Sequence, residues 1–392
     1  MVELKKDLSS IVERAEELYL DVDLRAVREW KDRHPGSKAI GFLPVYVPRE
    51  IVAACGALPV GVFGAGDQLE IIKGDACFQS YLCHLPRSVI ELALSRRLDC
   101  LDGMLFPSIC DVIRNLSGIW KMMFPDKLSR YVDLPQNFDP EIGGRFFSHE
   151  LEELTHDVAS LTGHIPSAAE MRATIELYNQ NRRLHEALYE SRRKEPWRVP
   201  TSELYLLTRA GNVLPVGEHN SMLRDYLEAA RRVSRRPMDM ARVVVTGAFC
   251  EQPPLDLLRT LERAGCYIVE DDFVLGARWL RADVSTRGDP IEALADAYLC
   301  HSVAHSSVFI GQAKKGEQLV DDVRRSAAEG VLFAAPSFCH PSLLDQPMLQ
   351  AALDEAKIPY TSFKYSENTG QFQVIREQAG TFADSIKLWS EA

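Results

Sequence analysis

The sequence predicts an α/β protein with two similar Rossmann-like domains. Each has a parallel sheet, the two face each other across a cleft, and an N-terminal helix and a helical linker arm complete the chain. The first observation behind this prediction is a shared order of elements. Each half opens with an apolar run, a helix that begins after a proline, a glycine and a second apolar run, which is the order of a parallel βαβ unit. These runs cover 39–47 and 58–63 in the first half, and 243–247 and 267–269 in the second.

The second observation is a pattern that occurs once in each half. Gly103 begins the sequence Gly-Met-Leu-Phe, which leads into Pro-Ser-Ile-Cys and ends at Cys110. Gly330 begins Gly-Val-Leu-Phe, which leads after two alanines into Pro-Ser-Phe-Cys and ends at Cys339. The same order of residues in corresponding places indicates an internal duplication, so the two halves should share one plan.

Changes in hydrophobic periodicity and glycine content divide the 392 residues into four parts. A charged amphipathic helix is expected from about residue 7 to residue 31. From about 146 to 235 helical periodicity dominates and glycine is scarce, and 171–193 should form one long helix. The expected parts are an N-terminal helical segment (1–36), a first α/β domain (37–145), a helical linker or arm (146–238) and a second α/β domain (239–392).

Composition excludes several classes of function. A net charge of −11 argues against a nucleic-acid partner, because phosphate binding needs a basic face. No stretch approaches the roughly 20 apolar residues of a membrane span, and the N-terminus lacks the apolar core of a signal peptide, so we expect a cytoplasmic protein without a membrane partner. The chain contains neither a Walker A sequence nor a GxGxxG fingerprint, so we expect no ATP or NAD site on it.

Cysteine is the residue type that points to chemistry. The chain has nine cysteines but no CxxC pair, which excludes the commonest zinc-ribbon and thioredoxin patterns. Cys110 and Cys339 stand out because each follows the carboxyl end of a predicted buried strand, where open α/β sheets bind ligands. Cys83 precedes a predicted helix over 85–94, whose N-terminal dipole would favour a thiolate.

Three convergent thiolates would suit an iron–sulfur cluster, and three protein ligands would leave one iron of a 4Fe-4S cube open to water or substrate. For any single cysteine the alternative is burial as a small hydrophobic residue. That interpretation is the one adopted for Cys55, Cys100, Cys250, Cys266 and Cys300. Cys77 lies six positions before Cys83 and stays open between core packing and a fourth cluster ligand.

Several segments resemble the family of 2-hydroxyacyl-CoA dehydratases and benzoyl-CoA reductases. Residues 48–60 are similar to the opening P-x-E-(I/L)-x-x-A-x-G-x-x-P-V of that family, and the segments that contain Cys83, Cys110 and Cys339 are similar to its three cysteine segments. The resemblance extends from about residue 38 to residue 390. It implies one oxygen-sensitive 4Fe-4S cluster on these three cysteines.

The family resemblance also implies partners. Members act as heterodimers of two related subunits, so a homologous B-type sister subunit is expected. A separate ATP-hydrolysing iron–sulfur activator, of A and D type, supplies single electrons that come from reduced ferredoxin, so ATP is used by the partners. Dehydratases use the electron to form a ketyl radical and eliminate water, whereas benzoyl-CoA reductases reduce the aromatic ring to a cyclic dienoyl-CoA. The modest length and the sequence Cys-His-Leu-Pro-Arg-Ser are most similar to the smaller, C-type benzoyl-CoA reductase subunit.

The chain departs from the family pattern in three places. Many members follow the first cysteine with Pro and the third with Asp, where this chain has His84 and His340. A Gly-Gln…Arg segment near the C-terminus is offset, at Gly370-Gln371 and Arg376. The two histidines are candidates for proton donors or outer partners of the cluster, and the alternative is a solvated loop histidine.

Other charged residues have two interpretations. Glu50, in the first turn of a helix at the cluster edge of the sheet, could relay protons, or could only complement the helix dipole. Arginine-rich stretches could bind CoA phosphates, although solvated helix faces are the ordinary interpretation. These stretches are Arg182-Arg183, Arg192-Arg193-Lys194 and Arg231-Arg232 with Arg235-Arg236. A different class of function, a non-catalytic electron carrier or cluster scaffold, would be favoured by a fourth protein ligand such as Cys77.

Overall fold

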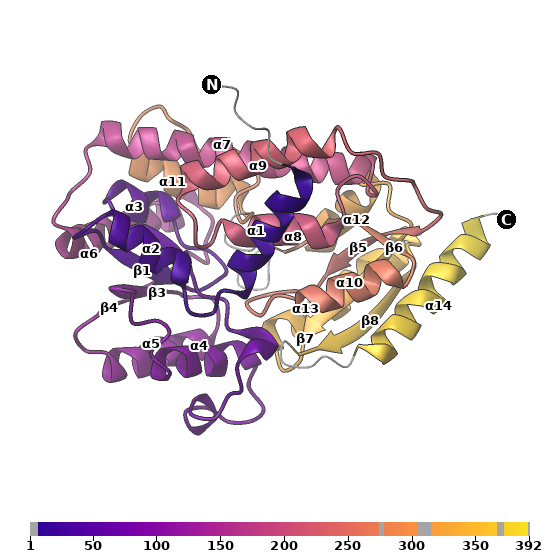
Figure 1. Cartoon of the computed structure of the whole chain (residues 1–392), viewed down its shortest axis with the longest axis horizontal. Helices are drawn as coiled ribbons and strands as arrows, with labels where there is room; N and C mark the ends of the chain where they lie inside the picture. Colours follow the sequence, from indigo (N-terminus) through magenta and orange to yellow (C-terminus); the bar gives the residue numbers. More distant parts are fainter. Residues whose placement is uncertain (1–6, 274–277, 304–314, 367–371, 391–392) are drawn as a thin grey trace.

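The structure is a computed structural model that describes residues 7–273, 278–303, 315–366 and 372–390. Within these residues the strands form two parallel sheets (Figure 1). The first contains β1 (Ala39–Phe42), β2 (Leu58–Gly61), β3 (Gly103–Pro107) and β4 (Leu128–Val132) in the order β2-β1-β3-β4. The second contains β5 (Ala241–Thr246), β6 (Cys266–Asp271), β7 (Gly330–Pro336) and β8 (Tyr360–Tyr365) in the order β6-β5-β7-β8. The matching orders confirm the predicted pair of similar parallel-sheet domains.

Helices cover the sheets and connect them. Those of the first half are α1 (Leu8–Leu20), α2 (Arg25–Arg33), α3 (Arg49–Ala54), α4 (His84–Leu94) and α5 (Asp111–Met123). The segment of chain between the strands of the two sheets contains α6 (Arg145–Thr162), α7 (Ala168–Lys194), α8 (Thr201–Ala210) and α9 (Val216–Ala230). The second half has α10 (Leu255–Arg263), α11 (Pro290–His301), α12 (Lys315–Arg325), α13 (His340–Ala356) and α14 (Gln373–Ser390). The predicted limits of the domains stay predictions, and Gly370-Gln371 lie outside the described residues.

The N-terminal segment differs from the single helix expected over 7–31. Helix α1 ends at Leu20 and α2 begins at Arg25, because Leu24 adopts a left-handed conformation with φ of 52°. The Asp21 carboxylate accepts a hydrogen bond from the backbone N–H of Ala26 at 3.0 Å, which satisfies a donor at the start of α2. Polar capping thus interrupts a helical pattern whose apolar spacing continues across the break.

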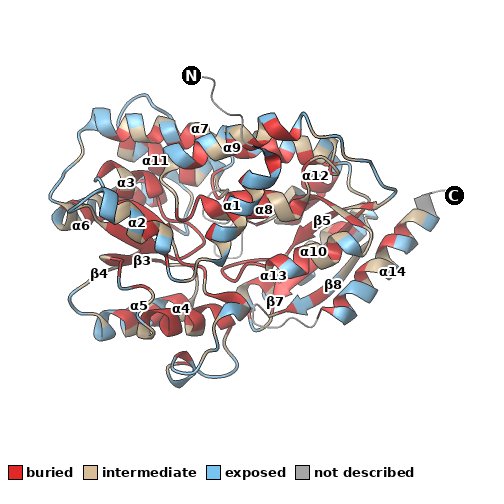
Figure 2. Cartoon of the chain, viewed as in Figure 1, coloured by how far each residue is buried: buried red, intermediate tan, exposed pale blue. Residues whose placement is uncertain are grey.

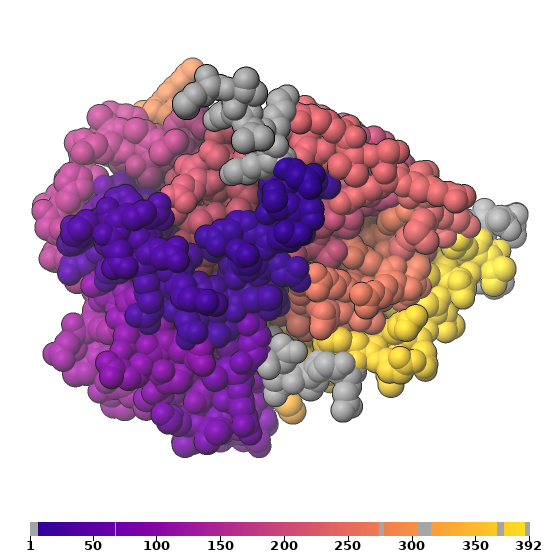
Figure 3. Space-filling view, viewed as in Figure 1, coloured from indigo at the N-terminus to yellow at the C-terminus, as the bar shows by residue number. Residues whose placement is uncertain are grey.

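One hydrophobic core joins the two halves. A single cluster of buried side chains includes residues of both sheets, and Figure 2 shows buried residues along the sheets and on the inward faces of the helices. Helix α1 packs against α8, and Glu16 of α1 forms an ion pair of 2.7 Å with Arg259 of α10. In Figure 3 this N-terminal segment spans the boundary between the two halves. Among the helices of the described residues, none has the length and apolar character needed to cross a membrane.

Helix α7 connects the two sheets through buried ion pairs. It extends along one side of the molecule past both halves (Figure 1). Near the first sheet, Arg182 Nη1 lies 2.6 Å from Glu50 Oε1 of α3, and both side chains are largely buried. Near the second sheet, Arg192 is fully buried and its Nη1 lies 2.7 Å from Asp271 Oδ2 at the end of β6. Since buried charges must be compensated, these pairs favour one relative position of the sheets.

The stability of the first connection can be tested by removing one partner. Arg182→Ala leaves the Glu50 carboxylate buried without its cation, and we expect a loss of about 3–5 kcal/mol in the free energy of unfolding. Arg183→Ala is the matched control, because Arg183 is half-exposed on the same helix and should cost less than about 1 kcal/mol. Chemical denaturation measures both, and equal losses in the two variants would contradict the role given to the buried pair.

A second test concerns Asp272, directly after β6. Its Oδ2 accepts hydrogen bonds from Thr246 Oγ1 at 2.8 Å and from the Gly247 N–H at 2.7 Å, while burial raises the pKa of Asp272 to about 7. Between pH about 4 and pH 7 the folded chain therefore holds a proton that the unfolded chain has lost. This contribution to stability is complete below pH about 4 and disappears as pH rises through 7.

Asp272→Asn should abolish this pH dependence. Relative to the variant, the wild-type free energy of unfolding should fall between pH 5 and 7 with a slope approaching about 1.4 kcal/mol per pH unit. Denaturant midpoints measured at several pH values for both proteins provide the slope. Parallel curves would show that the Asp272 carboxyl titrates at the same pH in the folded and unfolded chains.

Candidate cysteine site

The three predicted cluster cysteines share one local geometry. Cys83, Cys110 and Cys339 each occupy the position directly before the first residue of a helix, namely α4, α5 and α13. Backbone N–H groups at a helix N-terminus have no partner within the helix, and the helix dipole places partial positive charge there. The helix dipole at each position therefore favours a thiolate, and burial opposes that effect at Cys83 and Cys339.

The duplication places two of these cysteines equivalently. Cys110 follows β3 and Cys339 follows β7, each after a Pro-Ser-x turn. The N–H of Ser108 bonds to the last carbonyl of β4 at 2.9 Å, and the N–H of Ser337 bonds to the last carbonyl of β8 at 2.6 Å. The repeated sequence pattern thus corresponds to a repeated turn, which directs each cysteine from the carboxyl edge of its sheet.

The three thiols interact electrostatically although they come from different halves of the chain. Burial raises the pKa of Cys83 far above its ordinary value, and Glu251, Cys339 and Cys110 raise it further. Burial also raises the pKa of Cys339 to about 12, although a hydrogen bond from the Ser342 backbone opposes this rise. The mutual effects show that the structure brings Cys83, Cys110 and Cys339 together.

A fourth thiol belongs to this group and was not predicted from the sequence. Cys250 lies in the loop after β5, and only 3% of its surface is exposed. Interaction with the neighbouring Cys250 thiol lowers the pKa of Cys110 and outweighs the effect of burial. Burial raises the pKa of Cys250 well above its ordinary value, and Cys110, Cys339 and Cys83 add to that rise. The signal in the sequence was its distance of four residues from a strand at the same sheet edge.

Contacts between the halves surround this group. The backbone N–H of His84, at the start of α4, donates to Glu251 Oε2 at 3.0 Å. The Tyr365 hydroxyl, at the end of β8, donates to the Glu251 carbonyl at 2.7 Å. Glu251 is itself buried, and its carboxyl group raises the pKa of both Cys83 and Cys339. The residues next to two of the cysteines therefore hold the two halves in contact.

The other predicted site residues lie in contrasting surroundings. His84 is buried at the first position of α4, whereas His340 is exposed at the first position of α13. Glu50 is buried in α3, and its carboxylate is paired with Arg182. Cys77 is partly exposed, and its thiol lies 3.9 Å from the carbonyl of Lys73.

The three thiols are soft donors of the kind that hold iron–sulfur clusters. In the described part of the chain, no three or more His, Cys, Asp or Glu side chains are arranged to hold one ion. In a 4Fe-4S cube each cysteine sulfur binds a different iron, so the sulfur atoms surround the cluster and do not converge on one point. Of the three thiols, Cys83 and Cys339 are buried and Cys110 is partly exposed, and each stands at a helix N-terminus.

A surface groove of about 790 Å³ opens beside Cys110. Its lining includes Tyr131, Ile142 and Phe146, and the last two side chains are exposed to solvent by 60% and 47%. Exposed apolar side chains gathered at a concave surface are typical of ligand or partner contacts. The groove gives an approach from solvent to the edge of the cysteine site.

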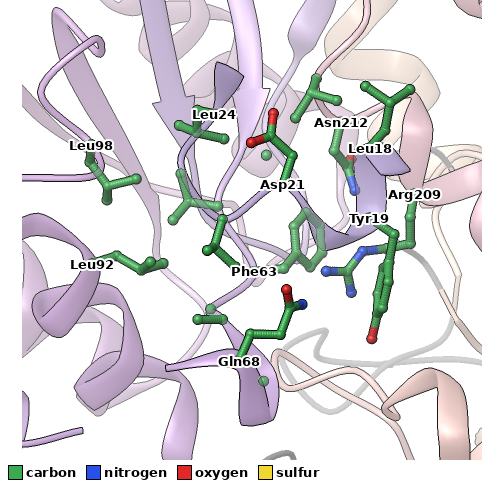
Figure 4. A pocket seen from close by; sticks show the side chains of 17 residues that line it. Leu18, Tyr19, Asp21, Leu24, Phe63, Gln68, Leu92, Leu98, Arg209 and Asn212 are labelled. Carbon is green, nitrogen blue, oxygen red and sulfur yellow. The ribbon is translucent and has the colours of Figure 1, made fainter. Parts of the chain in front are cut away.

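A second, smaller pocket lies away from the cysteines, between α1, the end of β2 and α8 (Figure 4). The Asn212 side chain is buried there, and neither its Nδ2 nor its Oδ1 has a hydrogen-bond partner among the described residues. The guanidinium of Arg209 lies over the rings of Tyr19 and Phe63, 5.1 Å and 4.9 Å from their centroids. A buried amide with free donors and acceptors is ordinarily satisfied by ordered water.

Comparison with known proteins identifies the family. The family model described as 2-hydroxyglutaryl-CoA dehydratase, D-component, matches residues 44–386. The C-type subunit of benzoyl-CoA reductase from Thauera aromatica is 54% identical over 383 residues, which cover 97% of this chain and 99% of that protein. The (R)-phenyllactyl-CoA dehydratase beta subunit of Clostridium sporogenes is 25% identical over 90% of this chain and 92% of that subunit. The beta subunit of (R)-2-hydroxyglutaryl-CoA dehydratase from Acidaminococcus fermentans is 26% identical over 91% of this chain and 94% of that subunit. The chain therefore belongs to the 2-hydroxyglutaryl-CoA dehydratase D-component family, as its motifs indicated.

Proposed function

We propose that this chain is the 4Fe-4S-binding subunit of an ATP-dependent benzoyl-CoA reductase. The complex would reduce the aromatic ring of benzoyl-CoA, or of a substituted analogue, to a cyclic dienoyl-CoA. The observation that carries the proposal is that Cys83, Cys110 and Cys339 each stand at a helix N-terminus and come from both halves of the chain, yet influence one another's pKa. The choice of reaction is supported by the 54% identity to a benzoyl-CoA reductase subunit over nearly the full length of both chains.

When bound, the cluster would supply single electrons at low potential. The residues of this chain would hold it, shield it and orient it. Three cysteines would provide sulfur ligands, and the N–H groups at the starts of α4, α5 and α13 would stabilise the negative charge on those sulfur atoms. Burial of Cys83 and Cys339 would keep bulk water from the site.

The groove beside Cys110 is the proposed approach for the acyl-CoA. Tyr131, Ile142 and Phe146 offer the apolar and aromatic contacts that suit a planar ring. His340, exposed directly after Cys339, is the better placed of the predicted proton donors. His84 is buried and would act as an outer partner of the cluster, and Glu50 already has a cation as its partner.

The proposed enzyme also needs partner chains. The relatives are named as subunits, which supports assembly with a B-type sister subunit. Exposed apolar side chains beside Cys339 would suit that contact, namely Phe338, Leu344 and Met348. Activator subunits of A and D type would hydrolyse ATP and pass on electrons from reduced ferredoxin. The reducing cytoplasm is the proposed compartment, because all nine cysteines are free thiols.

The second candidate is a subunit of a 2-hydroxyacyl-CoA dehydratase. It is favoured by the family model and by relatives of 25–26% identity that are dehydratase beta subunits. A carrier function gains some support from the fourth thiol, Cys250, beside Cys110. The higher identity to the reductase subunit favours ring reduction over both alternatives.

Iron content tests the ligand assignment. After anaerobic preparation the chain should contain about four irons and four sulfides. Ser substitutions at Cys83, Cys110 or Cys339 should each remove most of that iron, because each removes a thiolate ligand. Cys266→Ser is the matched control, a buried thiol in β6 remote from the site, and it should keep full iron content. Full iron content in the Cys339 variant would contradict the assignment.

Response to substrate distinguishes enzyme from carrier. In the complex reconstituted with its sister and activator subunits, benzoyl-CoA should change the electron paramagnetic resonance signal of the cluster and be reduced to a dienoyl-CoA. Cys77→Ala should retain iron and reductase activity, because Cys77 is directed to the Lys73 carbonyl. Turnover of a 2-hydroxyacyl-CoA without any reduction of benzoyl-CoA would favour the dehydratase. Loss of the cluster in Cys77→Ala, together with no spectral response to any acyl-CoA, would favour the carrier.

A further inference from the structure

We propose that the pocket around Asn212 binds a small uncharged carboxamide. The pocket lies between α1, the loop after β2 and the end of α8, and no cysteine is among the described residues that line it (Figure 4). The Asn212 side chain lines this pocket and is only 3% exposed, and neither atom of its amide has a hydrogen-bond partner among the described residues. The site is therefore separate from the cysteine site, and the inference does not depend on the proposed function.

The backbone fixes the position of Asn212. Its N–H donates to the Arg209 carbonyl at 3.0 Å, and its carbonyl accepts from the N–H of Gly61, at the end of β2, at 2.8 Å. A Cβ atom at Gly61 would lie 2.9 Å from Cβ and Cγ of Asn212, so glycine leaves the room that the asparagine side chain occupies. In Figure 4 the amide end of Asn212 points toward the space beside Arg209 and Phe63. The amide is thereby held at the wall of the pocket.

The amide of Asn212 determines what a ligand must offer. Its Oδ1 accepts hydrogen bonds and its Nδ2 donates them, and a buried polar atom that stays unpaired is costly. A carboxamide presents an N–H and a C=O side by side, so it can meet both atoms in one planar pair. A carboxylate or a ketone has only acceptors and would leave Oδ1 without a donor.

Charges of both signs at the pocket favour an uncharged ligand. The Arg209 guanidinium lies over the rings of Tyr19 and Phe63. Asp21, directly after α1, lines the same pocket, and its carboxylate accepts from the Ala26 N–H. An anion would be repelled by Asp21 and a cation by Arg209, whereas the dipole of a carboxamide suits both charges.

The size and the apolar wall of the pocket favour a short-chain amide over a group of water molecules. The cavity of about 60 Å³ has room for about four to six water-sized positions, which is the size of a small organic molecule. The apolar part of the wall is formed by Leu18, Val22, Leu24, Phe63, Leu92 and Leu98. An ordered water needs about two to four polar partners, which this part of the wall does not supply. A molecule with an amide at one end and a short alkyl group at the other suits both parts of the wall.

Binding of three probes of similar shape to the full chain tests the inference. Propionamide has the required donor and acceptor, butanone carries a methyl group in place of the amino group, and propionate is charged. We expect saturable binding of propionamide, at least about tenfold tighter than that of butanone or propionate, because a site built for a donor rejects analogues that lack it. Equilibrium dialysis with labelled probes gives the three affinities.

Variants of the chain locate the binding site. Asn212→Leu replaces the amide by an apolar side chain of similar shape, and should weaken propionamide binding about tenfold or more while the chain stays folded. Val22→Phe keeps the amide but narrows the pocket from the turn between α1 and α2, and should have the same effect on binding. Asn115→Leu, at an exposed position of α5, is the matched control and should bind propionamide like the wild type.

Several outcomes would overturn the inference. Propionamide and butanone might bind the wild type equally, or a folded Asn212→Leu variant might keep wild-type affinity. If circular dichroism shows that this variant is unfolded, wild-type affinity in Val22→Phe decides against the site. No saturable binding of propionamide to the wild type would assign the Asn212 amide to ordered water. None of these measurements requires iron, so a chain without a cluster would contradict only the proposed function.

Discussion

The buried ion pairs of α7 are the constraint on which the rest of the structure depends. Each pair takes charges out of water, and that cost is offset only when the partners stay in contact. Arg182 binds the Glu50 carboxylate beside the first sheet, and Arg192 binds Asp271 at the end of the second. A shift of one half against the other would separate at least one pair inside the core. The relative position of the sheets is thereby defined, and two arginine-rich stretches expected on solvated faces serve this internal purpose.

A site built from both halves needs such a constraint. Cys83 and Cys110 come from the first half, and Cys339 comes from the second. Displacing the halves would change the distances among these sulfur atoms, whereas a rigid cluster tolerates only small changes in ligand position. The bond from the His84 N–H to Glu251 is the local counterpart of the α7 pairs, because it joins the two halves within a residue of a cysteine on each side.

The features that could be predicted from the sequence depend on motifs of neighbouring residues. The Pro-Ser-x-Cys echo predicted equivalent positions for Cys110 and Cys339, and the paired turns after β3 and β7 have that equivalence. Contacts between distant residues escaped prediction. Arg182 and Glu50 are 132 positions apart, and no periodicity links them. The sequence around Cys250 does not distinguish it from an ordinary buried cysteine, and only the fold brings it near Cys110. The break at Leu24 was missed because apolar spacing continues through it.

The surroundings of the proposed cluster combine opposing effects on its potential. Burial in an apolar core disfavours the extra negative charge of the reduced state, and the buried Glu251 carboxylate adds to that penalty. Three helix N-termini act in the opposite sense. A low potential requires burial and the Glu251 carboxyl group to outweigh the helix N-termini. Reversible reduction requires the helix N-termini to limit that penalty. The His84 N–H and the Tyr365 hydroxyl anchor the loop at Glu251, so the conformation of that loop affects the contribution of its carboxyl group.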